Sequence, residues 1–97
     1  MAINDQDLRG TVLTALKLQY PEWVLFRVLY RWLTQDWGIT IDMSELRLQL
    51  AYLAEKGYVE TSQITLENVS TKIEKVRCTV KGVDLVDRRT TDPGVSF

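Results

Sequence analysis

The sequence predicts an α+β domain, in which three helices and a short strand precede a β-hairpin and a C-terminal helix. Two patterns indicate this arrangement. Within residues 43–56, Leu46, Leu50 and Leu53 recur at the spacing of one helix face. Residues 75–80 alternate polar and apolar side chains, which is typical of a strand with one face on the core. Together they favour helices packed against a small antiparallel sheet.

Two more helices are expected before that leucine-rich segment. The first runs from Asp5 to about Leu18, with an apolar face of Leu8, Val12, Ala15 and Leu16. The second starts at Pro21, because proline is tolerated in the first turn of a helix, and runs to about Asp36. Its core-facing side chains are expected to be Leu25, Val28, Leu29 and Trp32. The β-branched triplet Ile39–Ile41 is the candidate short strand.

The third helix, residues 43–56, has recognisable ends. Asp42 is a suitable N-cap, because a short carboxylate accepts hydrogen bonds from the first free amides of a helix. Gly57 ends the helix, since glycine takes the left-handed conformation without a steric cost. Thr79 is placed in the same way to cap the last helix, in which Val83 and Val86 are expected to face inward.

The hairpin is predicted from Tyr58–Leu66 and Lys72–Val80, with Glu67–Thr71 at its tip. Its first strand lacks a clean alternation. Val59 and Ile64 fall on opposite faces, so we expect a bulge or an irregular strand there.

Length and composition limit the possibilities. The 97 residues suffice for one domain, which we expect over residues 1–91, followed by a flexible tail over 92–97. The sequence lacks an apolar run long enough to cross a membrane, and its polar start predicts no signal peptide. One cysteine, Cys78, cannot form a disulfide within the chain, which suits the cytoplasm. The net charge of −1 is unusual for a dedicated nucleic-acid binder.

The helix ending LAYLAEKGYVE (50–60), the hairpin and the segment CTVKGVDLVDRR (78–89) resemble winged-helix (winged helix-turn-helix) regulators. More narrowly, the chain resembles small winged-helix proteins encoded in prophages similar to phage Mu. It shares with them its length, the helix ending, and the positions Thr79, Gly82, Asp84, Pro93, Gly94 and Val95. The resemblance covers most of the chain. It implies a winged-helix fold with one added helix and a regulatory or phage accessory role.

Enzyme chemistry is not expected. The chain has no histidine, which removes the commonest general base and metal ligand. A lone Cys78 has no imidazole partner, and its place in the alternation directs it into the core. The five glycines are scattered and form no phosphate-binding loop. We therefore predict a protein without a cofactor, a metal ion or a small-molecule substrate.

A first candidate surface for double-stranded DNA is the outward face of the third helix. That face is expected to carry Ser44, Glu45, Leu48, Ala51, Tyr52 and Glu55, with Arg47 and Gln49 at its edges. Arg47 and Gln49 are candidates for hydrogen bonds to base edges, and Tyr52 for a phosphate contact. The competing interpretation is a solvated helix face of mixed charge.

The second candidate surface is the hairpin, which is the wing of the predicted fold (about residues 67–81). It carries the basic residues Lys72, Lys75, Arg77 and Lys81. Such residues fit contacts with DNA phosphates. Alternatively, they protect an exposed strand against aggregation.

A third surface points to protein partners. The second helix has an additional apolar stripe of Trp23, Phe26, Tyr30, Leu33 and Trp37. If part of it is exposed, it could mediate a homodimer, as could the terminal helices. If the first and last helices cover it, the stripe belongs to the core. The rival to DNA binding is therefore a protein-interaction module that docks a partner through this stripe, Leu48 and Tyr52.

Overall fold

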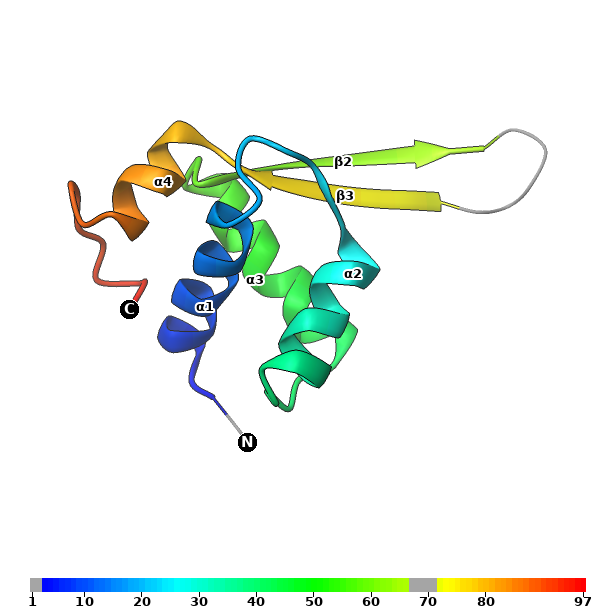
Figure 1. The fold of residues 1–97 in the computed structure, drawn as a ribbon, viewed down its shortest axis with the longest axis horizontal. Coiled ribbons are helices and arrows are strands. Elements are labelled where there is room, and N and C mark those ends of the chain that lie inside the picture. The colour runs from blue at the N-terminus through cyan, green and yellow to red at the C-terminus, as the bar shows by residue number, and fades with distance from the viewer. Residues whose placement is uncertain (1–2, 67–71) are drawn as a thin grey trace.

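The computed structural model describes residues 3–66 and 72–97 and has the predicted α+β character (Figure 1). The elements follow in the order α1 (Asp5–Lys17), β1 (Val24–Leu25), α2 (Phe26–Arg31), the π-helical turn η1 (Trp32–Asp36), α3 (Met43–Glu55), β2 (Val59–Thr65), β3 (Lys72–Cys78) and α4 (Val80–Val86). The hairpin tip expected at Glu67–Thr71 lies outside the described residues. Among the described helices, none is long and apolar enough to cross a membrane.

The three strands form an antiparallel sheet in the order β1-β3-β2. Pairing of β2 with β3 runs without interruption from Val59 opposite Cys78 to Thr65 opposite Lys72. The expected bulge is therefore wrong. The start of β2 and the end of β3 pack on the helices, and the far end of the hairpin projects past them (Figure 1). Regular pairing sets Ile64 opposite Ile73 on the outer face of this projecting part, where Ile64 is 42% exposed.

The core lies between the helices and the inner face of the sheet. Side chains from every helix and strand enter it, and the largest fully buried ones are Leu8, Leu13, Leu16, Leu29, Leu33, Leu46, Leu53 and Leu85. The predicted leucine stripe of α3 is confirmed, since Leu46, Leu50 and Leu53 are all buried. Cys78 is buried as predicted, and burial raises the pKa of its thiol to about 11.

The second helix starts later than predicted. Pro21 lies in the turn after α1, with a cis Tyr20–Pro21 peptide bond, and the helix begins only at Phe26. Val24 pairs with Val76 of β3 instead, so a short strand occupies part of the expected helix. The core-facing stripe shifts accordingly: Phe26, Leu29 and Leu33 are buried, whereas Val28 and Trp32 are half-buried and Leu25 is in β1. The predicted strand at Ile39–Ile41 is an extended loop whose two isoleucines are buried.

The predicted helix ends are confirmed. The Asp42 carboxylate accepts a hydrogen bond from the amide of Glu45 at 2.8 Å, and Thr79 accepts one from Gly82 at 3.1 Å. The Asp42 carboxylate also accepts from the Ser44 hydroxyl, and these bonds lower the pKa of Asp42. Gly57 has a φ of 82°, in the left-handed region.

The C-terminal tail (residues 92–97) is packed rather than loose. The Tyr58 hydroxyl donates to the Asp92 carboxylate at 2.6 Å, and the amide of Ser96 donates to the carbonyl of Gln6 at 3.0 Å. Val95 is buried in the core. The tail thus returns to the N-terminal end of α1 (Figure 1), and the sequence prediction of a flexible tail missed these long-range contacts.

Candidate nucleic-acid interface

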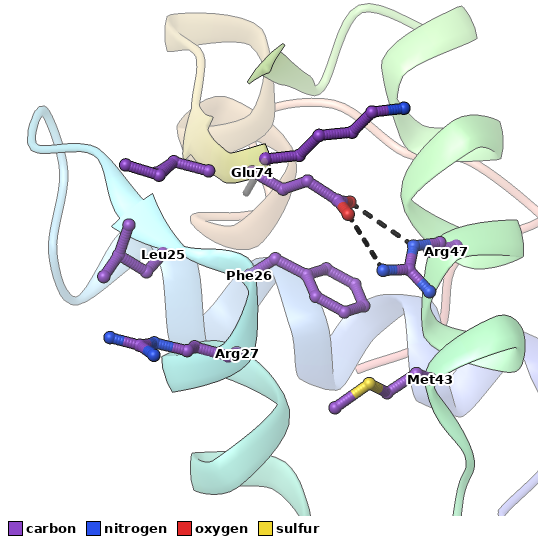
Figure 2. A pocket seen from close by; sticks show the side chains of 8 residues that line it. Leu25, Phe26, Arg27, Met43, Arg47 and Glu74 are labelled. Carbon is purple, nitrogen blue, oxygen red and sulfur yellow. Dashed lines mark hydrogen bonds and ion pairs between the residues drawn. The ribbon is translucent and has the colours of Figure 1, made fainter. Parts of the chain in front are cut away.

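A cleft of about 410 Å³ lies where the beginnings of α2 and α3 face strand β3 (Figure 2). It is lined by Leu25, Phe26, Arg27, Met43, Arg47, Lys72, Ile73 and Glu74. Half of these side chains are apolar and half are charged, with three cations and one carboxylate. The cleft is therefore an amphipathic surface of net positive charge, beside the open face of α3.

Arg47 reaches from α3 across this cleft and is held on two sides. Its Nε and Nη2 donate to the two carboxylate oxygens of Glu74, at 3.3 and 2.9 Å. Its guanidinium also lies 4.5 Å from the centre of the Phe26 ring, within the range of a cation–π contact. The hydrogen bond with Glu74 raises the pKa of Arg47. The side chain is nevertheless 51% exposed, so it is fixed without being buried.

Two of the predicted contact residues lie on the outward face of α3. Leu48 is 67% exposed. Ser44 is exposed at the first turn, where its hydroxyl donates to Asp42 at 2.6 Å. These two side chains and Arg47 are the predicted α3 contacts that remain available to a ligand.

Gln49 and Tyr52 lie on the opposite side of α3, toward α1 and the tail. Gln49 is only 2% exposed, and its side-chain oxygen accepts a hydrogen bond from Arg9 Nε at 2.7 Å. The Arg9 guanidinium lies 3.7 Å from the centre of the Tyr52 ring and also donates to the carbonyl of Gly94 at 3.0 Å. The expectation that Gln49 reaches DNA bases from an exposed edge is wrong. Its spacing from Leu46 and Leu53 already placed it on the buried stripe.

The hairpin cations do not form one patch. Lys72 is exposed beside the cleft, without an ion pair to any described residue. Lys75 and Arg77 share the outer sheet face, as the alternation predicted, and both lie over the ring of Trp23, at 5.0 and 4.5 Å. Arg77 also forms an ion pair with Glu60 at 2.9 Å, which partly neutralises it.

Lys81 is separate from the hairpin cluster. Its ammonium donates to the carbonyl of Lys56 at 2.9 Å and lies 5.3 Å from the ring of Tyr58. It therefore caps the C-terminal end of α3, which is a common place for a cation because the last carbonyls there lack partners. The grouping of Lys81 with Lys72 in one contact surface is not what the structure shows.

Sequence reasoning missed two charged residues of the cleft. Arg27, exposed at the start of α2, lines the cleft with its side chain pointing away from Arg47 (Figure 2). Helical periodicity highlights the apolar residues of this helix and gives no signal for Arg27. Glu74 is the one acidic residue between Lys72 and Lys81 in the sequence. Nothing in the local pattern indicates its pairing with Arg47, which is 27 positions away.

The second apolar stripe is mostly covered. Phe26 and Leu33 belong to the core, and the Tyr30 hydroxyl donates to the carbonyl of Ile41 at 2.9 Å. Trp37 stays partly exposed and lines a smaller cleft with Leu18 at the end of α1. Part of the stripe therefore stays exposed, at Trp37, while most of it belongs to the core, and the homodimer stays a prediction.

The part of the chain that the structure describes contains no group of three or more His, Cys, Asp or Glu side chains that could hold a metal ion. No family model, no curated protein and no solved structure matches this chain.

Proposed function

We propose that this chain is a winged-helix protein that binds double-stranded DNA. In this proposal α3 lies in the major groove and the β2–β3 hairpin lies beside the sugar–phosphate backbone of the DNA. The order of elements supports the proposal, because a short strand after the first helix pairs with the inner strand of a C-terminal hairpin. The hairpin also projects beyond the helices on the side of α2, as a wing would (Figure 1).

The observation that carries the proposal is that cations from three elements lie around one cleft beside the outward face of α3. Arg27 comes from α2, Arg47 from α3 and Lys72 from β3, and all three line one cleft. Arg27 and Lys72 form no ion pair with the described residues, so their charge is available to phosphates. Contacts of this kind release condensed counterions and supply most of the sequence-independent affinity for DNA.

The contact set differs from the one expected from sequence. Ser44, Arg47 and Leu48 enter the major groove, where Leu48 has the character to contact a thymine methyl group. Arg27 and Lys72 hold phosphates on either side. Gln49 and Lys81 leave the set because their polar groups are bound within the protein. Tyr52 leaves it because its ring is stacked under Arg9, on the other side of α3. A regulatory or phage accessory role is the setting that we propose for this activity.

Fluorescence anisotropy with a labelled mixed-sequence duplex, measured over a series of salt concentrations, tests the proposal. Affinity should fall steeply with salt, and Arg27→Glu or Lys72→Glu should each reduce the slope of log K against log salt by about one or more. Arg88→Glu is the matched control, since Arg88 is exposed at the end of α4, away from the cleft. If the chain fails to bind at low salt, or if Arg88→Glu weakens binding as much, the proposal is wrong.

A second candidate is a protein-interaction module on the same scaffold. The exposure of Leu48 favours it, because exposed apolar side chains on a helix contribute to docking surfaces when they form part of a larger patch. Met43, at the rim of the cleft, is exposed too. In this case Leu48→Asp would abolish association with the partner, whereas Arg27→Glu and Lys72→Glu would leave it unchanged. The effects of Arg27→Glu and Lys72→Glu thus separate the two functions.

A further inference from the structure

The Arg47–Glu74 pair has a geometry that goes beyond charge neutralisation. Glu74 engages Arg47 side-on, through Nε and Nη2. This mode leaves Nη1 and the second hydrogen of Nη2 pointing away from the carboxylate. Nη1 makes no hydrogen bond to any described residue. The unused edge therefore presents two parallel N–H donors, one on Nη1 and one on Nη2.

The orientation of the Arg47 guanidinium plane is fixed by a second contact, in addition to the hydrogen bonds with Glu74. The Phe26 ring lies against one face at 4.5 Å, and Phe26 is itself buried in the core. A free arginine samples many rotamers and loses that freedom when it binds. Arg47 has already lost much of it on folding, although half of its side chain remains exposed. Such preorganisation favours directional recognition.

Resting on the proposed DNA binding, we propose that Arg47 reads a guanine in the major groove and that Glu74 is the positioning residue that holds it for this contact. Two parallel N–H donors match the O6 and N7 acceptors of guanine, which no other base presents in that groove. The same fork would also match a phosphate, but the Glu74 carboxylate beside it repels phosphate oxygens. A fork held by a carboxylate is therefore better suited to a base edge than to the backbone.

This assignment predicts opposite effects on two kinds of binding. Glu74→Gln removes a negative charge near the DNA, so affinity for mixed-sequence duplex should rise. The same change weakens the hold on Arg47, so preference for guanine should fall. If the ion pair were merely structural, Glu74→Gln would still raise the affinity for every duplex by removing the charge, but it would leave the preference for guanine unchanged.

The experiment is selection from a randomised duplex library, followed by measurement of relative affinities with single-base variants of the selected site. The parent chain should prefer guanine at one position by about 10- to 100-fold. Arg47→Ala should abolish that preference, and Arg47→Lys should remove most of it, because an ammonium lacks the planar fork. Glu74→Gln should reduce the preference by about two- to tenfold, which is the range for ordering one flexible side chain.

Glu60→Gln is the matched control. Glu60 holds Arg77 through a comparable ion pair on the same hairpin, so the substitution changes the net charge equally without touching Arg47. It should leave the guanine preference unchanged. Amide spectra of each variant establish that the fold is retained, and Glu74→Gln keeps the size of the side chain.

The possible results separate the two proposals. A parent chain that binds no duplex overturns both. Duplex binding with an unchanged guanine preference in Arg47→Ala overturns the assignment of Arg47 and leaves DNA binding intact. A preference lost in Arg47→Ala but fully kept in Glu74→Gln overturns the positioning role of Glu74.

Discussion

Two arginines lie on opposite sides of α3, and each is stacked on an aromatic ring. Arg9 lies 3.7 Å from the centre of the Tyr52 ring, and Arg47 lies 4.5 Å from that of Phe26. Arg9 donates to two neutral acceptors, the Gln49 side chain and the Gly94 carbonyl. Arg47 instead donates twice to one carboxylate, that of Glu74. The two sides thus use the same residue type with different partners.

The partners decide what each arginine can do. Gln49 is buried, so its oxygen needs the Arg9 donor in order to avoid an unsatisfied polar group. Arg9 also joins α1, α3 and the tail at one point, which gives it a structural role. Arg47 serves no buried acceptor and is half exposed, so its free edge is open to a ligand. One side of α3 is therefore committed to the fold, and the other is open to recognition.

Arg9→Ala is expected to cause the largest loss of stability. It leaves the buried oxygen of Gln49 without a donor and removes the cation from the face of Tyr52. We expect the free energy of unfolding to fall by about 2–3 kcal/mol. Urea denaturation followed by tryptophan fluorescence measures the change. A loss smaller than about 0.5 kcal/mol would mean that water or another group replaces Arg9, and the two sides of α3 would then be equivalent.

Tyr58→Phe is expected to have an intermediate effect on the same side. The substitution removes the hydroxyl that donates to the Asp92 carboxylate at 2.6 Å, and it should cost about 1–2 kcal/mol at neutral pH. Burial, reinforced by the bond to Asp92, raises the pKa of Tyr58 from 10.0 to about 12. The raised pKa means that the folded protein favours the neutral hydroxyl. The stability that this hydroxyl contributes is therefore complete below pH 10 and disappears as the pH rises toward 12.

The dependence of stability on pH in the acid range provides an independent check of the hydrogen bond between Tyr58 and Asp92. The Tyr58 hydroxyl, with the amide of Gly94, lowers the pKa of Asp92 below 3.8. The contribution of Asp92 is therefore present above pH 3.8 and is lost as the pH falls through its lower folded value. Equilibrium unfolding of the parent and of Tyr58→Phe across pH should give curves that converge at both extremes. Parallel curves would contradict the assigned bond.

Local patterns predicted most of the fold. The expected first helix, Asp5 to about Leu18, and third helix, residues 43–56, agree with α1 and α3 to within one residue at each end. Periodicity and capping residues are properties of nearby positions, so one sequence suffices to find them. Strand β1 escaped prediction because two residues are too short to show a period. Its partner Val76 is also far away in the chain.

The candidate site was less predictable, because its pairings are long-range. The buried side-chain oxygen of Gln49 obtains its hydrogen-bond donor from Arg9, 40 positions earlier. The Arg47–Glu74 pair likewise depends on how α3 faces β3. Helical periodicity correctly placed Ser44 and Leu48 on an exposed face, but it cannot say which polar side chains the fold itself binds.

Arg47→Ala should have the smallest effect on stability. Exposed ion pairs contribute little, because solvent screens the charges and two long side chains lose freedom in forming them. The thermal unfolding midpoint should therefore stay within about 3 °C of the parent, and Glu74→Ala should behave alike. Differential scanning calorimetry of both variants, beside Arg9→Ala, measures this contrast directly. A drop in Arg47→Ala comparable to that in Arg9→Ala would make the cleft a structural contact. A negligible change in the unfolding midpoint would mean that the contacts of Arg47 do not serve stability, which supports a role for Arg47 in DNA recognition.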